Sequence, residues 1–348
     1  MASTMRDVAE RAGVSAKTVS NVINGYPFIR EETRLRVEAA LRELNYQMNV
    51  SARNLRRGAT GVIGLALPEL SLPYFAELAD AIMDAGHAAG LTVVIERTRG
   101  DRGGELDALR GQRRHTTDGL LYSPLALGPE DEHLLPAEAP LVLLGERIFS
   151  PRFDHVTMQN VEAARAATTY LLSLGRTRIA AIGVHPEEKV GSAALRLEGY
   201  RQALSAAGVV DDHALYGEAQ LWHRSTGAQA MAAVLDRGVR PDAIFAFNDT
   251  LGLGAMHELQ VRGYDIPRDI LVIGFDDVEE TRYSAPTMTS VNPGRQFIAQ
   301  TAVRLLLDRI GGRSEERSPE LIKAPFRIVE RVSTAVTQAD HRETGDAR

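Results

Sequence analysis

The first 44 residues repeat apolar side chains with a helical period in three separate stretches. Apolar positions recur three and four residues apart over 4–12, 16–24 and 30–44, which predicts three amphipathic helices. Gly13 breaks the pattern after the first stretch. Tyr26-Pro27 ends the second, because the residue before a proline is disfavoured in a helix. The positions expected to face inward are Val8, Ala9, Ala12, Val14, Val19, Val22, Ile23, Val37, Ala40, Leu41 and Leu44.

Two of these predicted helices carry a start signal. Thr4 can cap the first helix, with Asp7 completing a variant of the capping box, and Ser15 can cap the second. Two short helices joined by a glycine-containing turn of about four residues match the spacing of a helix-turn-helix. A generic three-helix bundle would show the same periodicity, but the compact turn and the polar outer face of the second helix favour DNA binding.

From Gly61 onward, short apolar runs alternate with amphipathic stretches, which predicts an α/β fold with parallel sheets. The expected strands cover 62–67, 91–95, 119–122, 141–144, 179–182, 243–247 and 271–275. The expected helices cover 74–89, 104–115, 161–174, 194–207, 226–237, 250–262 and 296–310. A length of about 275 residues in two halves favours two doubly wound lobes, although a TIM barrel would alternate in the same way.

Composition narrows the class of protein. The chain has 348 residues, of which 44% are hydrophobic and 25% charged, and this is typical of a globular protein with about two domains. The absence of cysteine excludes disulfides, iron–sulfur clusters, cysteine-ligated zinc and a thiol nucleophile. No apolar run reaches the roughly 20 residues of a membrane helix, and the charged N-terminus lacks an apolar signal core. We therefore expect a cytoplasmic protein.

Charge is distributed unevenly along the chain. Residues 1–60 contain ten Lys or Arg and six Asp or Glu, a net charge of +4, while the remainder carries 30 against 40, a net charge of −10. A basic head on an acidic body indicates that the head meets a polyanion. Residues 49–58 add three arginines and no acid, in a stretch too short to be a stable helix alone. It is either a linker or a short helix, folded only on a partner or DNA, whose Leu55 wedges into a minor groove.

The second predicted helix would enter the major groove. There Lys17 can donate to guanine, Asn21 can pair with adenine or hold a phosphate, and Ala16 can contact a thymine methyl group. The complete expected DNA-binding set is Thr4, Ser15, Ala16, Lys17, Thr18, Ser20, Asn21, Asn24, Ser51, Ala52, Leu55 and Arg56.

Sequence motifs for catalysis and metal binding are absent. The sequence has no phosphate-binding GxxxxGK[ST], no HExxH and no GxSxG with suitable partners. The nine histidines show no metal-ligand spacing, and His115, His133 and His155 are expected at the surface or as caps. We expect a protein that is not an enzyme and holds no metal or cofactor.

Polar side chains follow several predicted strands at their carboxyl ends, where open α/β sheets bind ligands. They are Glu69, Ser123, Glu146-Arg147, Asn248-Asp249 and Asp276-Asp277, and the single tryptophan, Trp222, lies beside His223 and Arg224. Carboxylate, amide and arginine groups beside an aromatic ring suit a polyhydroxylated ligand, because the polar groups bind hydroxyls and the ring packs on C–H bonds. Asp249 and Asp277 would also serve as simple helix caps.

Residues 8–24 (VAERAGVSAKTVSNVIN), with Thr33-Arg34 and Leu44-Asn45-Tyr46 after them, resemble the N-terminal domain of the lactose-repressor (LacI/GalR) family of bacterial transcriptional regulators. The likeness continues through residues 51–55 (SARNL), which correspond to the hinge helix of that family. In the body, residues 196–200 (RLEGY), 247–249 (FND) and 273–277 (IGFDD) resemble the effector-binding core. The resemblance spans nearly the whole chain.

This resemblance implies a repressor with a helix-turn-helix domain over 1–48, a hinge helix and linker over 49–59, and a two-lobed, periplasmic-binding-protein-like domain over 60–338. Residues 339–348 are expected to be a disordered tail. It also implies a homodimer or tetramer on a pseudo-palindromic operator, and three crossovers between lobes that return residues near 289–323 to the first. The implied effector is a sugar or sugar derivative, and the implied effector-binding residues are Glu69, Tyr74, Ser123, Glu146, Arg196, Trp222, Asn248 and Asp276.

The sequence departs from the family pattern at two positions. Met48 stands where the family usually has proline before the hinge helix, and Asn21 stands where arginine is common, so a different operator core is expected. The rival hypothesis is a sugar-binding module without regulatory DNA binding, against which the basic head and the missing signal peptide argue. An enzyme is a third possible class, but no residue in the sequence is identified as a nucleophile or a metal ligand.

Overall fold

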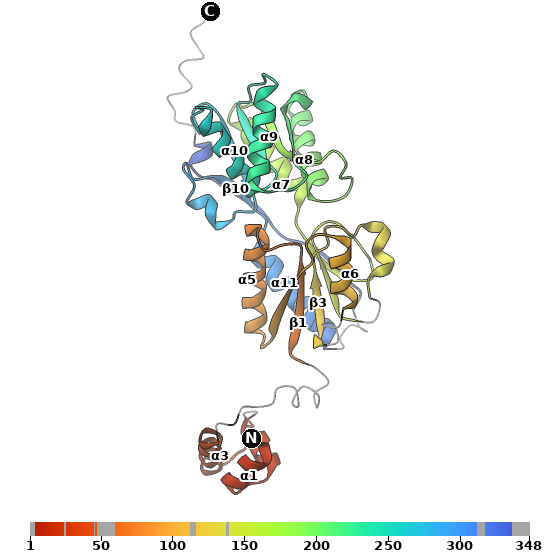
Figure 1. Cartoon of the computed structure of the whole chain (residues 1–348), viewed down its shortest axis with the longest axis vertical. Helices are drawn as coiled ribbons and strands as arrows, with labels where there is room; N and C mark the ends of the chain where they lie inside the picture. Colours follow the sequence, from red (N-terminus) through yellow and green to blue (C-terminus); the bar gives the residue numbers. More distant parts are fainter. Residues whose placement is uncertain are drawn as a thin grey trace, which may run out of the picture. The chain divides into compact units, whose positions relative to one another are not determined.

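The computed structural model describes residues 4–23, 26–44, 46, 60–111, 116–136, 139–311 and 317–335. The chain divides into two compact units, Met1–Thr60 and Gly61–Arg348. Figure 1 shows the helices of the first unit and the two α/β lobes of the second. Within the described ranges, no helix is long and apolar enough to cross a membrane.

The first unit contains the helices α1 (Met5–Ala12), α2 (Ala16–Ile23) and α3 (Glu31–Glu43). Thr4 and Asp7 form the predicted capping box: the Thr4 hydroxyl accepts from the Asp7 amide at 3.3 Å, and the Asp7 carboxylate accepts from the Thr4 amide at 2.7 Å. Gly13 ends α1 at φ 65°, in the left-handed region that favours glycine. Ser15 caps α2, because its hydroxyl accepts from the Thr18 amide at 3.1 Å.

Apolar side chains from all three helices close one small core. Val8, Val19 and Val37 are fully buried, one from each helix. Every inward position predicted from the helical period belongs to this core, buried or partly buried. Ala16 and Lys17 lie on the other face of α2 and are exposed. The prediction of three amphipathic helices is therefore confirmed.

The second unit contains two six-stranded sheets, with strand orders β11-β5-β4-β3-β1-β2 and β12-β10-β9-β8-β6-β7. The first sheet consists of β1 (Val62–Leu67), β2 (Thr92–Arg97), β3 (Gly119–Tyr122), β4 (Leu141–Leu144), β5 (Asp154–Thr157) and β11 (Leu321–Lys323). The second consists of β6 (Ile179–Val184), β7 (Tyr216–Glu218), β8 (Ala243–Ala246), β9 (Leu271–Phe275), β10 (Thr289–Asn292) and β12 (Arg327–Val329). The strand pairs are parallel apart from β10 with β12, so the unit has two doubly wound lobes and is not a TIM barrel.

Helices cover both faces of each sheet. The first lobe has α5 (Pro73–Ala88), α6 (Arg102–Arg110) and α11 (Arg295–Ile310), and the second has α7 (Asn160–Ser173), α8 (Ser192–Ala206), α9 (Arg224–Asp236) and α10 (Asp249–Val261). Short 3₁₀ turns cover Pro129–Leu134, His213–Leu215, Glu279–Arg282 and Val332–Thr334. Figure 1 shows α5 and α6 on opposite sides of the first sheet, and α11 packs beside α5.

The chain crosses between the lobes after β5, after β10 and after β11. The return to the first lobe begins later than the resemblance implied, because β10 pairs with β9 in the second sheet. Of the stretch 289–323, α11 and β11 are the described elements that belong to the first lobe. Gly294 lies at the second crossing with φ 79°, and a Cβ there would approach the Pro325 carbonyl oxygen at 2.4 Å, so only glycine fits where two crossings run close together.

The apolar pattern locates long buried strands and misses short polar ones. Strands β1, β3, β4 and β9 have the predicted bounds, and β2, β6 and β8 begin or end within two residues of them. Strand β5 reads Asp-His-Val-Thr and is buried throughout, yet it contains one apolar residue. Strands β7, β11 and β12 have three residues each, which is too short for a periodicity to show, and β10 reads Thr-Ser-Val-Asn, with one apolar residue.

Candidate functional site

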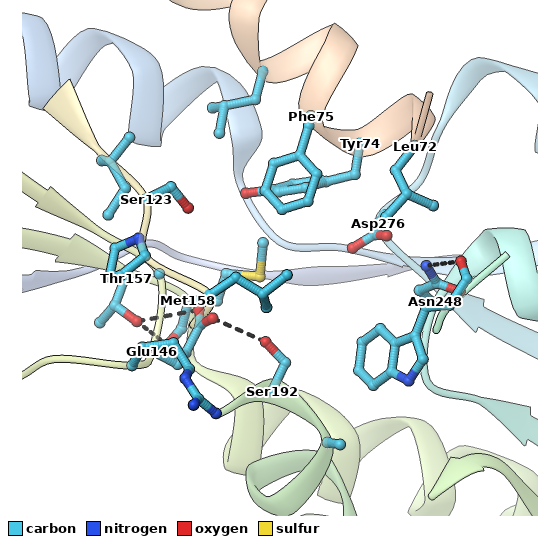
Figure 2. A pocket seen from close by; sticks show the side chains of 18 of the residues that line it. Leu72, Tyr74, Phe75, Ser123, Glu146, Thr157, Met158, Ser192, Asn248 and Asp276 are labelled. Atoms are coloured by element: carbon cyan, nitrogen blue, oxygen red, sulfur yellow. Dashed lines mark hydrogen bonds between the residues drawn. The ribbon is translucent and has the colours of Figure 1, made fainter. Parts of the chain in front are cut away.

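Carboxyl ends of strands from both sheets meet around a pocket in the second unit, with a cavity volume of about 170 Å³. Figure 2 shows Ser123 and Glu146, which follow strands of the first sheet, across the pocket from Asn248 and Asp276, which follow strands of the second. All the residues expected to bind an effector line this pocket: Glu69, Tyr74, Ser123, Glu146, Arg196, Trp222, Asn248 and Asp276.

Arg196 projects from α8 to the pocket and is only 2% exposed. Its Nε donates to Asn160 Oδ1 at 2.8 Å, and one terminal nitrogen donates to the Phe247 carbonyl. The other terminal nitrogen lies 4.0 Å from the Asp276 carboxylate. Burial lowers the pKa of Arg196, and the nearby carboxylates of Asp276 and Glu146 oppose that shift. The pocket therefore contains a rigidly held cation whose five N–H donors are not all used.

Asp276 directly follows β9, and its side chain is aimed at the pocket (Figure 2). Its φ is 120° and that of Asp277 is 51°, values that non-glycine residues rarely adopt. Such residues cost on the order of 1–3 kcal/mol each and persist only where surrounding contacts hold them. Burial raises the pKa of the Asp276 carboxyl to about 7, although Arg196 and Arg295 act in the opposite direction. A strained, poorly solvated carboxylate of this kind is well placed to accept hydrogen bonds from a ligand.

Asn248 connects the helix α10 to the loop that carries Trp222. Its Oδ1 accepts from the Leu251 amide at 2.8 Å, which caps α10, and its Nδ2 donates to the Trp222 carbonyl at 3.3 Å. The indole of Trp222 is half-buried, and the guanidinium carbon of Arg196 lies 5.3 Å from its ring centroid. Asn248 thus keeps one N–H for a ligand and also fixes the aromatic wall.

Glu146 forms the acidic part of the first-lobe wall and is 8% exposed. Its carboxylate accepts from the Thr157 hydroxyl at 3.3 Å and from the Ser192 hydroxyl at 2.9 Å. Because Ser192 lies in α8, the second bond joins the two lobes. Ser123 is buried next to this wall, and Tyr74 contributes from α5. Burial raises the pKa of the Tyr74 phenol, and the charge of Glu146 adds to the effect, so this phenol is a neutral hydrogen-bond donor.

Charged side chains from opposite lobes face each other beside the cavity. Glu69 lies 3.5 Å from His223 Nε2, and Arg147 lies 3.8 Å from the Glu188 carboxylate. Arg147 also donates to the Val190 carbonyl at 2.5 Å. These contacts join the first lobe to the second and use one terminal nitrogen of Arg147, whose buried Nε has no hydrogen-bond partner among the described residues.

Several lining residues were not predicted from the sequence. The apolar ones are Leu72, Phe75, Leu78, Pro124, Leu125, Leu144, Val156, Met158, Leu221 and Ile298, and the polar ones are Thr157, His185, Glu188, Ser192 and Gln220. Thr157 would have been found as a residue at a strand end, had β5 been recognised as a strand. The apolar residues carry no local signal, because the same residue types fill every core.

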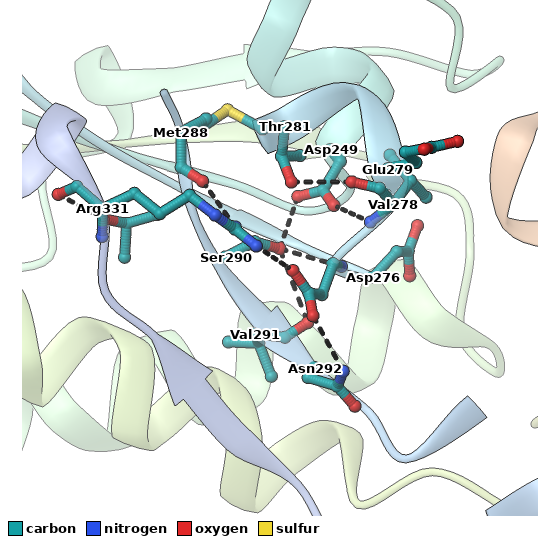
Figure 3. A network of polar contacts seen from close by, with 12 residues as sticks. Asp249, Asp276, Val278, Glu279, Thr281, Met288, Ser290, Val291, Asn292 and Arg331 are labelled. Atoms are coloured by element: carbon teal, nitrogen blue, oxygen red, sulfur yellow. Dashed lines mark hydrogen bonds and ion pairs between the residues drawn. The ribbon is translucent and has the colours of Figure 1, made fainter. Parts of the chain in front are cut away.

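The interpretation of Asp249 and Asp277 as helix caps is wrong. Figure 3 shows the Asp249 carboxylate inside a network of polar contacts that includes Ser290, Asn292 and Arg331. Asp249 accepts from the Ser290 hydroxyl at 2.6 Å. It is fully buried, and burial raises its pKa well above the ordinary value, although the bond from Ser290 acts in the opposite direction. Asp277 accepts from Arg331 at 2.5 Å and from Asn292 at 2.8 Å. The network ties the turn after β9 to β10 and to the C-terminal segment.

One of the three histidines expected at the surface or as a cap is buried. His155 lies in β5, is 2% exposed and has its Nε2 at 2.6 Å from the Gly145 carbonyl oxygen, and burial lowers its pKa. His133 lies in a 3₁₀ turn and is exposed, with Nδ1 at 3.0 Å from the Glu130 carbonyl oxygen. His115 lies outside the described residues. In the part of the chain that the structure describes, no group of three His, Asp or Glu side chains is arranged to hold a metal.

The candidate DNA-binding residues of the first unit differ in exposure and in the contacts they make. Thr4, Ser15 and Thr18 use their hydroxyls within the unit, since Ser15 Oγ also lies 2.9 Å from Thr18 Oγ1. Ala16 and Lys17 are exposed, whereas Ser20 and Asn21 are partly buried on α2. Asn24, Ser51, Ala52, Leu55 and Arg56 lie outside the described residues.

Comparison with protein families gives one match for each unit. The family described as bacterial regulatory proteins, lacI family, matches residues 4–49, and a periplasmic binding protein-like domain matches residues 168–334. The HTH-type transcriptional repressor PurR of Vibrio atlanticus is 31% identical over 328 residues, which are 92% of this chain and 97% of that protein.

Solved structures resemble the chain over one unit or both. A LacI-family transcriptional regulator from Sanguibacter keddieii is 49% identical and has a TM-score of 0.73, over 79% of this chain and 99% of that one. The transcriptional regulator CelR in complex with cellobiose is 31% identical with a TM-score of 0.69, over 95% and 99% of the two chains. The lac repressor dimer, bound to operator and the anti-inducer ONPF, is 27% identical with a TM-score of 0.82, over 97% and 100%.

Proposed function

Because the chain belongs to the lacI family of bacterial regulatory proteins, we propose that its pocket binds a sugar-like effector and that its helix α2 reads an operator. The protein is a DNA-binding transcriptional regulator controlled by a small molecule.

One observation carries the assignment of the pocket. Arg196, Asn248 and Asp276 converge from the second lobe beside the ring of Trp222, with Glu146 facing them from the first lobe. Guanidinium, amide and carboxylate groups offer both donors and acceptors to hydroxyls, and an indole face packs on sugar C–H bonds. CelR, a related chain, was solved in complex with cellobiose, which supports a sugar as the class of effector.

The balance of charge favours an uncharged ligand. Among the described side chains that line the pocket, Glu69, Glu146, Glu188 and Asp276 are carboxylates, while Arg147 and Arg196 are cations. Arg147 is already bound to Glu188 and to the Val190 carbonyl. A phosphate would therefore meet a net negative, poorly solvated site, where like charges repel strongly. We propose a neutral sugar and exclude a sugar phosphate.

The first unit is proposed to bind duplex DNA through the exposed face of α2. Lys17 and Ala16 project from it, and Asn21 lies one turn further on. Ser15 and Thr18 support this face by capping the helix. Two such units in a homodimer would read two half-sites, as expected of a relative of the lac repressor dimer, which was solved bound to its operator. The hinge residues Ser51, Ala52, Leu55 and Arg56 are proposed to complete the contact.

The remaining proposals follow from this role. The relatives are transcriptional repressors, so we propose that the chain has no enzymatic activity. A regulator of a bacterial chromosome acts in the cytoplasm, and we propose that location.

Ligand binding is tested by calorimetry on the purified full chain, with cellobiose, ribose and ribose 5-phosphate as probes. We expect micromolar to millimolar binding of a neutral sugar, no binding of the phosphorylated one, and loss of binding in Asp276→Asn. Stronger binding of ribose 5-phosphate than of ribose would contradict the charge argument. A panel of neutral sugars in which none binds would refute the sugar-like effector.

DNA binding is tested by selection from random duplexes at stated salt, because phosphate contacts alone give salt-sensitive, unspecific binding. Enrichment of a palindromic site is expected. If no site is enriched with or without the bound sugar, the alternative function, a sugar-binding module without regulatory DNA binding, is favoured.

A further inference from the structure

Two oppositely charged side chains of the first lobe form a pair next to the pocket without lining it. Glu77 lies on α5, and Arg295 is the first residue of α11, the helix that packs beside α5. The Arg295 guanidinium forms an ion pair with the Glu77 carboxylate. The side chains are 18% and 26% exposed, respectively, so water screens their attraction only in part.

Each member of this pair also binds the second lobe. Arg295 donates from its second terminal nitrogen to the Asp276 carbonyl at 2.9 Å, and Glu77 accepts from the Glu279 backbone amide at 2.9 Å. Arg295 therefore holds one end of the segment 276–279 as a donor, and Glu77 holds the other end as an acceptor. The two side chains are also paired with each other. Hydrogen bonds with one charged partner are about twice as strong as neutral ones, so these two contacts are substantial.

The segment held in this way is the strained turn that presents Asp276. The Asp276 amide donates to the Val291 carbonyl at 2.9 Å, and its carbonyl accepts from Arg295, so the backbone is fixed on both sides of the residue. A φ of 120° is costly for a non-glycine residue and persists only where surrounding contacts hold it. Arg295 is the one of these contacts that binds the Asp276 carbonyl from the first lobe, beside the polar network of Asp277.

We propose that Glu77 and Arg295 act together as a clamp that positions Asp276 for the ligand and holds the two lobes together at this edge of the pocket. The inference rests on the proposed role of Asp276 in effector binding. Both residues act through the segment 276–279, so they are positioning residues. Since closure of the lobes is the state that encloses a ligand, the clamp shifts the equilibrium between open and closed pocket toward closed before any ligand binds.

The single tryptophan of the chain provides a measurement that needs no ligand. Trp222 is half-buried and lines the pocket together with Glu69, Leu72 and Leu125 of the first lobe. Acrylamide, a neutral quencher, reaches the indole more often when the lobes part. In Glu77→Gln and in Arg295→Gln, the quenching constant should rise about twofold, because each substitution removes a charge-assisted contact between the lobes.

The matched controls lie on the same two helices. Asp80→Asn changes an exposed acid of α5, and Arg304→Gln changes an arginine of α11 that is 53% exposed and pairs with Asp308. In both control variants, acrylamide should quench the Trp222 fluorescence with the wild-type quenching constant. The double variant Glu77→Gln/Arg295→Gln should quench no more than either single variant, because the pair acts as one unit. Arg295→Lys keeps the charge and a donor, so it should recover part of the wild-type value.

Circular dichroism and melting of each variant show whether it is folded. Unchanged quenching in folded Glu77→Gln or Arg295→Gln would overturn the clamp, as would additive effects in the double variant or an equal rise in the two controls. Sugar binding is measured separately with the probes named above. If the chain binds no sugar but the variants show the expected quenching, the proposed effector is contradicted and the clamp stands. If the chain binds a neutral sugar but quenching is unchanged in the variants, the clamp alone is contradicted.

Discussion

The guanidinium group of Arg196 lies over the ring of Phe275, with its central carbon 3.6 Å from the ring centroid. Phe275 ends β9, and Asp276 follows it, so one turn supplies both the ring under the cation and the carboxylate beside it. Cation–π contacts gain strength when they are desolvated, and Arg196 is 2% exposed. The stacked arginine is therefore held in one orientation before a ligand arrives.

This stacking predicts that lysine cannot replace Arg196. Lysine is a point charge that cannot hold Asn160, the Phe247 carbonyl and the Phe275 ring at the same time. We expect Arg196→Lys to weaken binding of a neutral sugar by about 10- to 100-fold, the worth of a charge-assisted hydrogen bond. Calorimetry measures the change. Arg201→Lys, on the same helix but 43% exposed, is the control and should bind normally; wild-type affinity in Arg196→Lys would contradict the assignment.

The ionisation of Asp276 predicts a pH dependence of stability. Its pKa is raised from 3.8 to about 7 in the folded protein, mainly by burial. Between about pH 4 and 7 the folded chain therefore keeps the Asp276 proton, whereas the unfolded chain has lost it. The contribution of this group to the free energy of unfolding is complete below about pH 4 and is lost as the pH rises through 7. Asp276→Asn cannot ionise and should melt at a higher temperature than the wild type at pH 8, with little difference at pH 4.5. An equal difference at both pH values would show that ionisation is not the cause.

The ion pair between Arg331 and Asp277 predicts a large loss of stability when it is broken. The two side chains are 11% and 1% exposed, and their contact is 2.5 Å long. Arg331→Met should destabilise the second unit by about 3–5 kcal/mol, because it leaves a buried carboxylate without its cation. Denaturant unfolding measures this. Arg268→Met removes an arginine that is 70% exposed and should change the free energy of unfolding by about 0.5 kcal/mol or less; similar losses in the two variants would refute a special role for Arg331.

Two substitutions should separate base recognition by the exposed face of α2 from binding to the phosphate backbone. Lys17→Ala should relax the preference at one position of each half-site, at a cost of about 1–3 kcal/mol for the preferred base. Arg56→Ala should weaken binding to all sequences alike and reduce the salt dependence, because an arginine on the backbone reads no base. Selection followed by titration at two salt concentrations distinguishes these effects. A Lys17→Ala protein with an unchanged base preference would place Lys17 on the phosphate backbone.

Local patterns predicted most of the first unit. Helix caps at Thr4 and Ser15 and a break at Gly13 act within four residues along the chain, so the sequence contains all that is needed to find them. The apolar spacing identified every buried core position of the three helices, because a helix has one period and one buried face, and it missed the partly buried Met5. The long strands of the second unit were found for a similar reason, since a strand covered on both faces reads as an unbroken apolar run.

The sequence by itself therefore determined the three-helix head and the alternation of strands and helices in the body. Through residues at strand ends and the family resemblance it also gave part of the polar lining of the pocket, including Arg196, Asn248 and Asp276. Only the tertiary structure decided that β10 belongs to the second sheet, that His155 is buried, that Asp277 is bound to Arg331, and that Arg295 supports Asp276. Arg331 lies 54 positions from Asp277, and Arg295 lies 19 from Asp276. Such contacts leave no periodicity in the sequence, because each depends on where two separately formed elements are placed by packing.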